Sequence, residues 1–155
     1  MSDEGRSTVV GRGLVSGLAG TAVMTAFQLL VEMPITGRAE SDAPASFAEK
    51  VLPIRRTRGG GRRALNYAAH FGIGAMWGVA FGVAERAGLR GQRAVGTVFG
   101  VVYTGDAILN TALGLYKPWR WSAQDWVIDV GEKLIQAEAT GLVYQRLAPE
   151  ASTRS

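Results

Sequence analysis

The chain contains long runs of residues without a charged side chain, and charged residues bound each run. The central run, 64–84, reads ALNYAAHFGIGAMWGVAFGVA and lies between Arg63 and Glu85. As a helix it would be about 32 Å long, which matches the thickness of the hydrocarbon core of a bilayer. The pattern predicts a membrane-spanning helix over about 64–85. The alternative is a glycine-rich helix buried inside a soluble protein.

Two further runs have the same character. Residues 13–31 carry no charge, so we expect a first span over about 13–33 that ends at Pro34. Residues 94–116 contain one charged side chain, Asp106, and predict a third span. A signal peptide is the alternative for the first run. The acidic residues before it and the absence of a clear small-residue cleavage site argue against that alternative.

The last apolar segment, 126–147, is the most polar of the four. Asp129, Glu132, Lys133 and further polar residues lie among its apolar positions, with most of the polar residues on one helical face. We expect a fourth span whose polar face is sheltered by the other helices, because that face would not insert against lipid. A surface amphipathic helix is the alternative. The sequence thus predicts an all-α fold, an integral membrane four-helix bundle of residues 13–147 between polar tails at 1–12 and 148–155.

Small residues recur every fourth position along the predicted spans. In the central span this row continues from Asn66 and His70 into three glycines. Glycine at that spacing lets the backbone of a second helix approach closely, so we expect Gly-rich helix interfaces of the glycine-zipper type. The expected packing glycines are Gly17, Gly74, Gly78, Gly82, Gly96 and Gly100.

The connection 35–63 is long and basic. Residues 44–52 favour a short interfacial helix, and the sequence PIRRTRGGGRR follows it. We expect this arginine-rich stretch to form a flexible collar that contacts anionic lipid headgroups. A nucleotide-binding glycine loop is the alternative, but the spacing of a phosphate-binding motif is missing. A cluster of aromatic residues follows the third span and indicates a belt at the membrane surface, with a carbohydrate- or base-stacking surface as the alternative: Tyr116, Trp119, Trp121 and Trp126.

The amino-acid composition excludes several kinds of functional site. The 155 residues form one unit, with no cysteine and one histidine, so neither a thiolate nor a multi-histidine metal site can form. The net charge is +4, and the arginines lie between the apolar segments. This distribution favours lipid headgroups over nucleic acid as the binding partner. We therefore expect no enzyme activity, cofactor or metal, and no nucleic-acid partner. The expected partners are the bilayer and a second copy of the chain or another membrane protein.

The polar residues inside the spans are the candidates for function. An intramembrane carboxylate is costly to insert, by roughly 2.5–3.5 kcal/mol, so Asp106 should face protein or water, with Asn110 or the last helix as its partner. His70 titrates nearest to neutral pH, although a hydrogen-bonded packing role is the alternative. Glu32 at the end of the first span is either an interfacial or a functional carboxylate. The candidate site comprises His70, Asn66, Asp106, Asn110, Asp129, Glu132 and Glu32.

Four short motifs resemble the YagU-like family of small bacterial inner-membrane proteins. They are EMPITGR at 32–38, HFGIG at 70–74, the LGL of 113–115 followed by Pro118 and Trp119, and the acidic, aromatic-flanked start of the last helix. The resemblance covers about 13–144 and implies a multi-pass protein of the bacterial cytoplasmic membrane, with a suggested link to acid survival. Members of the family often carry a histidine in the last helix, where this chain has Lys133 or Gln136.

Two classes of function remain open. The first is a structural or accessory membrane protein. Glycine rows in excess of those needed to pack the four helices would favour this class. The second is a protein that conducts protons or a small solute, for which His70, Asp106, Asp129 and Glu132 would have to meet in one cavity. An intramembrane hydrolase would use Ser16 and His70, but the sequence spacing does not connect these two residues to an acidic residue and an oxyanion hole. Positive charges favour the 35–63 and 116–125 loops on the cytoplasmic side.

Overall fold

The computed structural model describes residues 3–148, with side chains described from Thr8 onward, and all regular structure in this range is helical. This confirms the all-α prediction. The last residues of the expected C-terminal tail, 149–155, lie outside the described residues. The elements are α1 (Asp3–Phe27), η1 (Gln28–Glu32), α2 (Met33–Thr36), α3 (Ala43–Val51), α4 (Gly59–Arg86), α5 (Gly91–Ala112), η2 (Pro118–Arg120) and α6 (Ala123–Arg146).

The first helix is longer than predicted at both ends. It begins at Asp3, inside the expected polar tail, and η1 joins α1 to α2 without leaving helical backbone angles. The prediction that Pro34 ends this helix is wrong. Segment η1 is a π-helix, so the α-helical bonding pattern already changes just before Pro34, where the N–H is missing. The helix ends instead at Gly37, which has a left-handed φ of 69° and donates its N–H to the Met33 carbonyl.

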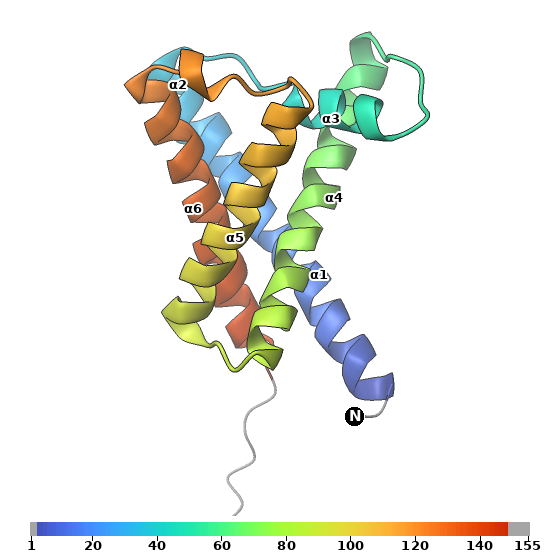
Figure 1. The fold of residues 1–155 in the computed structure, drawn as a ribbon, viewed down its shortest axis with the longest axis vertical. Helices are drawn as coiled ribbons and strands as arrows, with labels where there is room; N and C mark the ends of the chain where they lie inside the picture. Colours follow the sequence, from blue (N-terminus) through green and yellow to red (C-terminus); the bar gives the residue numbers. More distant parts are fainter. Residues whose placement is uncertain (1–2, 149–155) are drawn as a thin grey trace, which may run out of the picture.

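Helix α1 crosses α4 and α6 diagonally and packs against both of them (Figure 1). Glycines make the crossing with α4 close: a Cβ added at Gly78 would lie 1.7 Å from the Gly13 carbonyl oxygen, and one at Gly17 would lie 2.4 Å from that of Gly74. On the α6 side, a Cβ at Gly20 would lie 1.9 Å from the hydroxyl of Thr140. These backbone contacts fix the crossing points, because any larger residue would force the helices apart.

The expected packing glycines divide into two groups. Gly17, Gly74 and Gly78 lie at the α1–α4 crossing, and Gly82 contacts the side chain of Val9. Gly96 and Gly100 of α5 differ, since a Cβ added at either would meet nothing within 4 Å in the described chain. The expectation of a close helix contact at these two α5 glycines is therefore wrong for the monomer. They lie on the outer face of a helix that packs through Val95 and Val98 instead.

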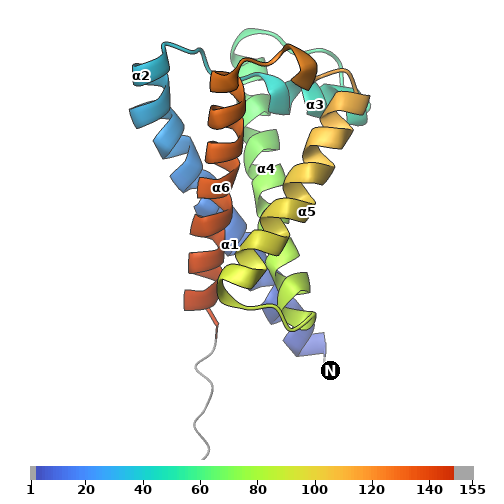
Figure 2. The ribbon, with the colours of Figure 1, turned by 60° about the vertical axis from the view of Figure 1, so that its left-hand side comes forward.

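Helix α5 packs on α4 and α6 away from the α1 crossing (Figure 2). The core between these three helices centres on Trp77 and Phe81 of α4, Val95 of α5, and Ala137 and Tyr144 of α6. Helices α5 and α6 diverge toward the end of the bundle that carries α3 and η2 (Figure 2). We call this end the α3 end.

The predicted short helix at 44–52 is present as α3, and an ion-pair cluster joins its segment to α4. Arg62 donates to Asp42 at 2.8 Å and to Glu49 at 3.0 Å. The prediction of a flexible collar through the three glycines is wrong, because α4 begins at Gly59 and the glycines form its first turn. The two ion pairs on Arg62 hold this turn in place. Arg55, Arg56 and Arg58 remain exposed in the connection.

Two of the helices are long and apolar enough to cross a membrane: Thr8–Thr36, which comprises most of α1 with η1 and α2, and Gly59–Arg86, which is α4. Large apolar side chains are exposed on all four long helices. Examples from each are Val15 on α1, Met76 on α4, Val101 on α5 and Val127 on α6.

Candidate functional site

Two adjoining cavities lie at the α3 end, and together they contain every polar candidate that the sequence provides. The main cavity has a volume of about 300 Å³ and the smaller one about 50 Å³, with His70 and Lys133 in the wall of both. The main cavity is lined by Glu32, Asn66, His70, Asp129 and Glu132, among others. Asp106 and Asn110 line the smaller one. Residues from four separate helical segments therefore converge on one polar interior.

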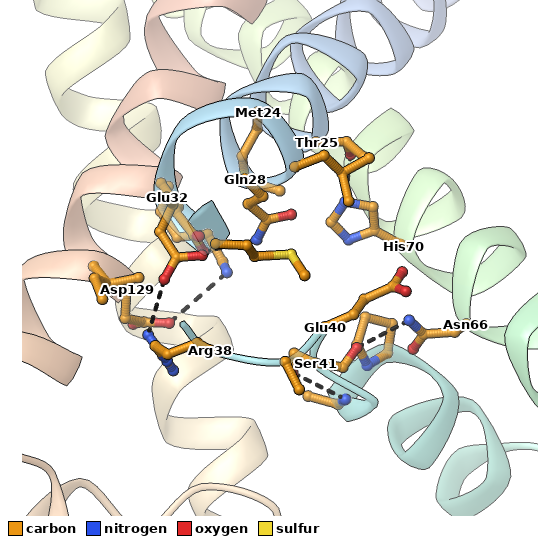
Figure 3. Close-up of a pocket in the computed structure, with 18 of the residues that line it drawn as sticks. Met24, Thr25, Gln28, Glu32, Arg38, Glu40, Ser41, Asn66, His70 and Asp129 are labelled. Atoms are coloured by element: carbon orange, nitrogen blue, oxygen red, sulfur yellow. Dashed lines mark hydrogen bonds and ion pairs between the residues drawn. The ribbon is translucent and has the colours of Figure 1, made fainter. Parts of the chain in front are cut away.

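His70 lies at the cavity wall opposite the first helix, and Figure 3 shows Thr25 beside it. Its Nε2 is 3.1 Å from the Thr25 hydroxyl, which in turn lies 2.8 Å from the Thr21 carbonyl oxygen. Because a threonine hydroxyl has a single hydrogen and the carbonyl can only accept, Thr25 accepts from Nε2–H. The imidazole is thus held as the Nε2–H tautomer when neutral, with Nδ1 left as an acceptor.

The carboxylates of α6 are each bound by a side chain from another helix. Gln28 of η1 donates to Glu132 at 2.8 Å, and the Tyr103 hydroxyl of α5 donates to Asp129 at 2.8 Å. Lys133 lies 4.0 Å from Asp129, one helical turn before it. Glu132 is 92% buried, since its exposed fraction is 8%. The polar face of the last helix is therefore sheltered by the other helices.

Glu32 is placed by the π-helical segment. Its carboxylate accepts from the Thr36 hydroxyl at 2.8 Å and lies 3.9 Å from Arg38, whose other contact is Asp125 at 3.7 Å. Figure 3 shows Glu32 and Gln28 turned into the same space. A π-helical turn adds a residue to the helical repeat and is frequent at functional sites. Here it lies where the first helix forms the wall of the main cavity.

Asp106 has the partner that its position in the third span predicts. The Asn110 amide donates to the Asp106 carboxylate at 2.9 Å and to its backbone carbonyl at 3.0 Å. Both residues line the smaller cavity, so Asp106 faces the interior of the bundle. Asn66 has a different role. It accepts from the Ala45 N–H at 3.0 Å and donates to the Ser41 carbonyl at 2.9 Å, which fixes the start of α3 against α4.

Several polar residues of the site were not predicted from the sequence. Thr25 and Gln28 lie on the small-residue rows of the first span, Tyr103 precedes Asp106 in the third, and Gln136 lies one turn after Glu132. Their signal was a polar side chain inside an otherwise apolar run. The aromatic residues were assigned only to the membrane surface, yet Tyr116 and Trp121 line the main cavity. Their rings are 5.4 Å apart, centroid to centroid.

Neither a metal centre nor a hydrolase is indicated by the described residues. In residues 8–148, no three His, Asp or Glu side chains come together in a way that could hold a metal ion. The Ser16 hydroxyl donates to the Arg12 carbonyl at 2.7 Å and is buried in the helix packing, while the hydrogen-bond partner of His70 is Thr25. What the arrangement provides is a set of proton donors and acceptors around a space large enough for a small molecule.

The opposite end of the bundle is closed by a buried charged cluster. The Arg12 side chain donates to the Tyr144 hydroxyl at 2.6 Å and pairs with Glu85, and Tyr144 also donates to Glu85 at 2.9 Å. These three residues come from α1, α4 and α6. They join the helices at the end away from the cavities.

The chain matches no protein-family model, and no curated protein or solved structure shows significant similarity to it. The fold and the site together define an all-α protein with two helices long and apolar enough to cross a membrane and a polar cavity at one end.

Proposed function

We propose that this protein is a multi-pass protein of the bacterial cytoplasmic membrane, with α1, α4, α5 and α6 as spans, which takes protons or a small polar solute into the cavities at the α3 end. One observation carries the proposal: the polar candidates of all four spans meet in one interior, whereas the outer faces of the same helices are apolar. Polar residues in the interior and apolar residues on the outer surface are the distribution expected of a protein that spans a bilayer.

Burial supports the membrane part of the proposal. Only 28% of the apolar stretch of the first candidate span and 39% of that of α4 is buried inside the protein, whereas the core helix of a soluble protein is mostly buried. Helices α5 and α6 expose apolar side chains too, with exposed fractions of 65% at Ile108 and 72% at Val127. Large contiguous apolar surfaces are rare on soluble monomers, and here apolar side chains are exposed on every long helix. Lipid would cover them.

The glycine contacts favour solute handling over a purely structural role. A structural or accessory protein was the first expectation because three spans carry glycine rows. The rows on α1 and α4 are now accounted for, since they pack against each other within one chain. The row on α5 differs, because Gly96 and Gly100 meet no neighbour in the described residues, and this row supports a membrane-protein partner as the second candidate function.

Reconstitution tests the proposal in two steps. First, the protein should stay in the pellet when membranes are washed with alkaline carbonate; release into the supernatant would refute a spanning protein. Second, liposomes with a trapped pH-sensitive dye should show proton flux above that of empty liposomes. Asp106→Asn and Glu132→Gln should lower the flux, and Glu138→Gln, which neutralises an exposed carboxylate of the same helix, should not. Equal flux in all variants would refute a role for the cavity.

For the second candidate, a cysteine at Gly100 reports on the outer face of α5. Disulfide-linked dimers of Gly100→Cys in membranes, with none for a cysteine at the exposed Met76 of α4, would support an α5 interface. Absence of cross-linking at both positions would leave α5 facing lipid and remove this candidate.

A further inference from the structure

The charge of the cavity walls is opposite to that of the whole chain. The protein has a net charge of +4, yet carboxylates outnumber cationic side chains around the main cavity, which is lined by five carboxylates against Arg38 and Lys133. The smaller cavity has one carboxylate, and Lys133 lines it too. The carboxylates are Glu32, Glu40, Asp106, Asp125, Asp129 and Glu132. Since potentials inside a low-dielectric cavity are set mainly by the nearest charges, the interior favours a positive ligand.

Hydrogen-bond acceptors without a donor point in the same direction. One carboxylate oxygen of Glu132, Oε1, and the side-chain oxygens of Asn110 and Gln136 accept no hydrogen bond from residues 8–148. All three residues are more than nine-tenths buried, with exposed fractions of 8%, 4% and 3%, and each lines one of the cavities.

The orientation of the two amides is fixed by their partners. The amide nitrogen of Gln136 is 3.0 Å from the Thr21 hydroxyl, whose hydrogen is donated to the Gly17 carbonyl, so that hydroxyl can only accept. The Asn110 nitrogen faces two oxygens of Asp106. In both side chains the oxygen is therefore the free atom. Among the described residues, the fully buried side-chain atoms without a partner are Arg12 Nε and Thr140 Oγ1, so these three oxygens are accessible and not sealed in the packing. A ligand that donates hydrogen bonds would pair them.

The spacing of the carboxylates and the aromatic walls decide between kinds of cation. Within the described chain no three carboxylate or imidazole groups gather closely enough for a metal ion, so the negative charge is spread around the cavity. Tyr67, Tyr116 and Trp121 line the same space. Aromatic faces attract organic cations, and a volume of about 300 Å³ suits a small organic molecule.

We infer that the cavities bind a small organic ammonium ion, held between the carboxylates and free acceptors of α5 and α6 and the aromatic walls. This inference rests on the proposed solute cavity and names the chemical class of its ligand. Glu132 would contact the ammonium group through its free oxygen, and Lys133 would oppose binding by its like charge.

Three probes of matched shape test the inference: butylammonium, 1-butanol and butanoate. Each is titrated calorimetrically into the purified protein in detergent at neutral pH, against potassium chloride of equal ionic strength and with protein-free micelles as the blank. We expect butylammonium to bind and the other two to show no measurable binding. Equal binding of 1-butanol, or preferred binding of butanoate, would overturn the inference.

Variants distinguish the loss of charge recognition from a general loss of the folded structure. Glu132→Gln should weaken butylammonium binding by roughly ten- to a hundredfold, and Glu138→Gln should leave it unchanged. Lys133→Gln should tighten binding severalfold, a gain that misfolding cannot produce. An unchanged affinity in both Glu132→Gln and Lys133→Gln would refute the assignment.

The outcomes also separate this inference from the proposed function. Proton flux that depends on Asp106 and Glu132, without butylammonium binding, would overturn the ammonium site and leave the membrane cavity in place. Release of the protein by alkaline carbonate would refute the membrane proposal, whatever the probes show.

Discussion

The guanidinium of Arg12 lies 4.0 Å above the ring centroid of Tyr144 and donates to the hydroxyl of the same residue. In the sequence, Arg12 is the charged boundary before the first apolar run and Glu85 the boundary after the central one. The structure pairs the two across Tyr144, so the N-terminal part of α1 and the C-terminal ends of α4 and α6 lie at one level (Figure 1). Boundary charges thus also hold the helices together.

This cluster predicts a stability effect at the end away from the cavities. Arg12→Met should lower the free energy of unfolding by about 1–3 kcal/mol, because Glu85 and Tyr144 lose a partly buried partner. Arg93→Met, which removes an exposed arginine of α5, is the matched control and should have little effect. Thermal unfolding in detergent measures both. Equal unfolding temperatures for the two variants would show that the cluster adds no stability.

The glycine contacts predict opposite outcomes for the same substitution at two sites. Gly78→Ala adds a methyl group where the Gly13 carbonyl oxygen lies 1.7 Å away, so we expect a loss of about 1–3 kcal/mol in unfolding free energy. Gly100→Ala meets nothing within 4 Å and should be neutral or stabilising by up to about 1 kcal/mol, because alanine favours the helix. Thermal unfolding again provides the measurement. A Gly78→Ala protein as stable as wild type would contradict the crossing geometry.

The helices were predictable where charge-free runs defined them, and their ends were not. The runs at 13–31 and 64–84 lie in helical segments, because apolar length dominates such segments. Most of the run at 94–116, which has Asp106 as its one charge, lies in α5, but α5 ends at Ala112 and not at the predicted 116. Two helix ends were predicted wrongly because other contacts outweigh the local tendency to break a helix. At Pro34 the helix continues through a π-helical turn. At the three glycines of 59–61, the ion pairs of Arg62 hold the first turn of α4. Propensity is a weak guide wherever tertiary contacts compete with it.

The candidate residues of the site could be predicted from the sequence, but their arrangement around a common cavity could not. Asp106 and Asn110 share a helix, so their contact follows from i,i+4 spacing. The approach of His70 to Thr25 depends on where α1 crosses α4, which no single helix encodes. The crossing follows from the glycines, and only the three-dimensional arrangement shows that it brings the polar stretch of each span to the same end. The link to acid survival implied by the family resemblance stays a prediction.

The Glu49 carboxylate predicts a pH effect in the α3 connection. The backbone N–H of Thr57, which donates to Glu49 at 2.7 Å, lowers the pKa of this carboxylate, with smaller contributions from the Thr57 hydroxyl and Arg62. A lowered pKa means that the contact stabilises the connection above the ordinary value of about 4.5, and that this is lost as the pH falls through the folded-state pKa.

Pepsin should therefore cut within residues 52–58 increasingly as the pH is lowered from 5 toward about 3. Glu49→Gln removes the titrating group, so its cleavage rate in this segment, relative to that of an unstructured reference peptide at the same pH, should be high already at pH 5 and change little on acidification. Identical pH profiles for Glu49→Gln and wild type would contradict the assignment.

If the protein spans the membrane as proposed, the positive charges at the two ends of the bundle predict its orientation. The segments 35–63 and 113–122 lie together at the α3 end and carry nine Lys and Arg residues, against seven at the opposite end and in the terminal segments. For the proposed membrane protein, the positive-inside rule then predicts that the α3 end lies in the cytoplasm. Arg55→Cys and Ala87→Cys introduce exposed thiols at opposite ends of α4. A membrane-impermeant maleimide added to intact cells should label Ala87→Cys alone; labelling of Arg55→Cys alone would reverse the topology.

Asp106 predicts a separation of stability from activity. Asp106→Asn keeps the shape and the polarity of the side chain, so the fold should be retained while proton flux in liposomes falls, because the group can no longer ionise. Asp106→Leu also removes the acceptor of the Asn110 amide, which leaves that buried amide with only the backbone contact, and should lower the unfolding free energy by about 1–2 kcal/mol. Thr104→Leu, at an exposed position two residues away on the same helix, controls for added apolar volume and should change neither property. A Leu variant that is more stable than wild type and retains its flux would mean that Asp106 serves neither function nor packing.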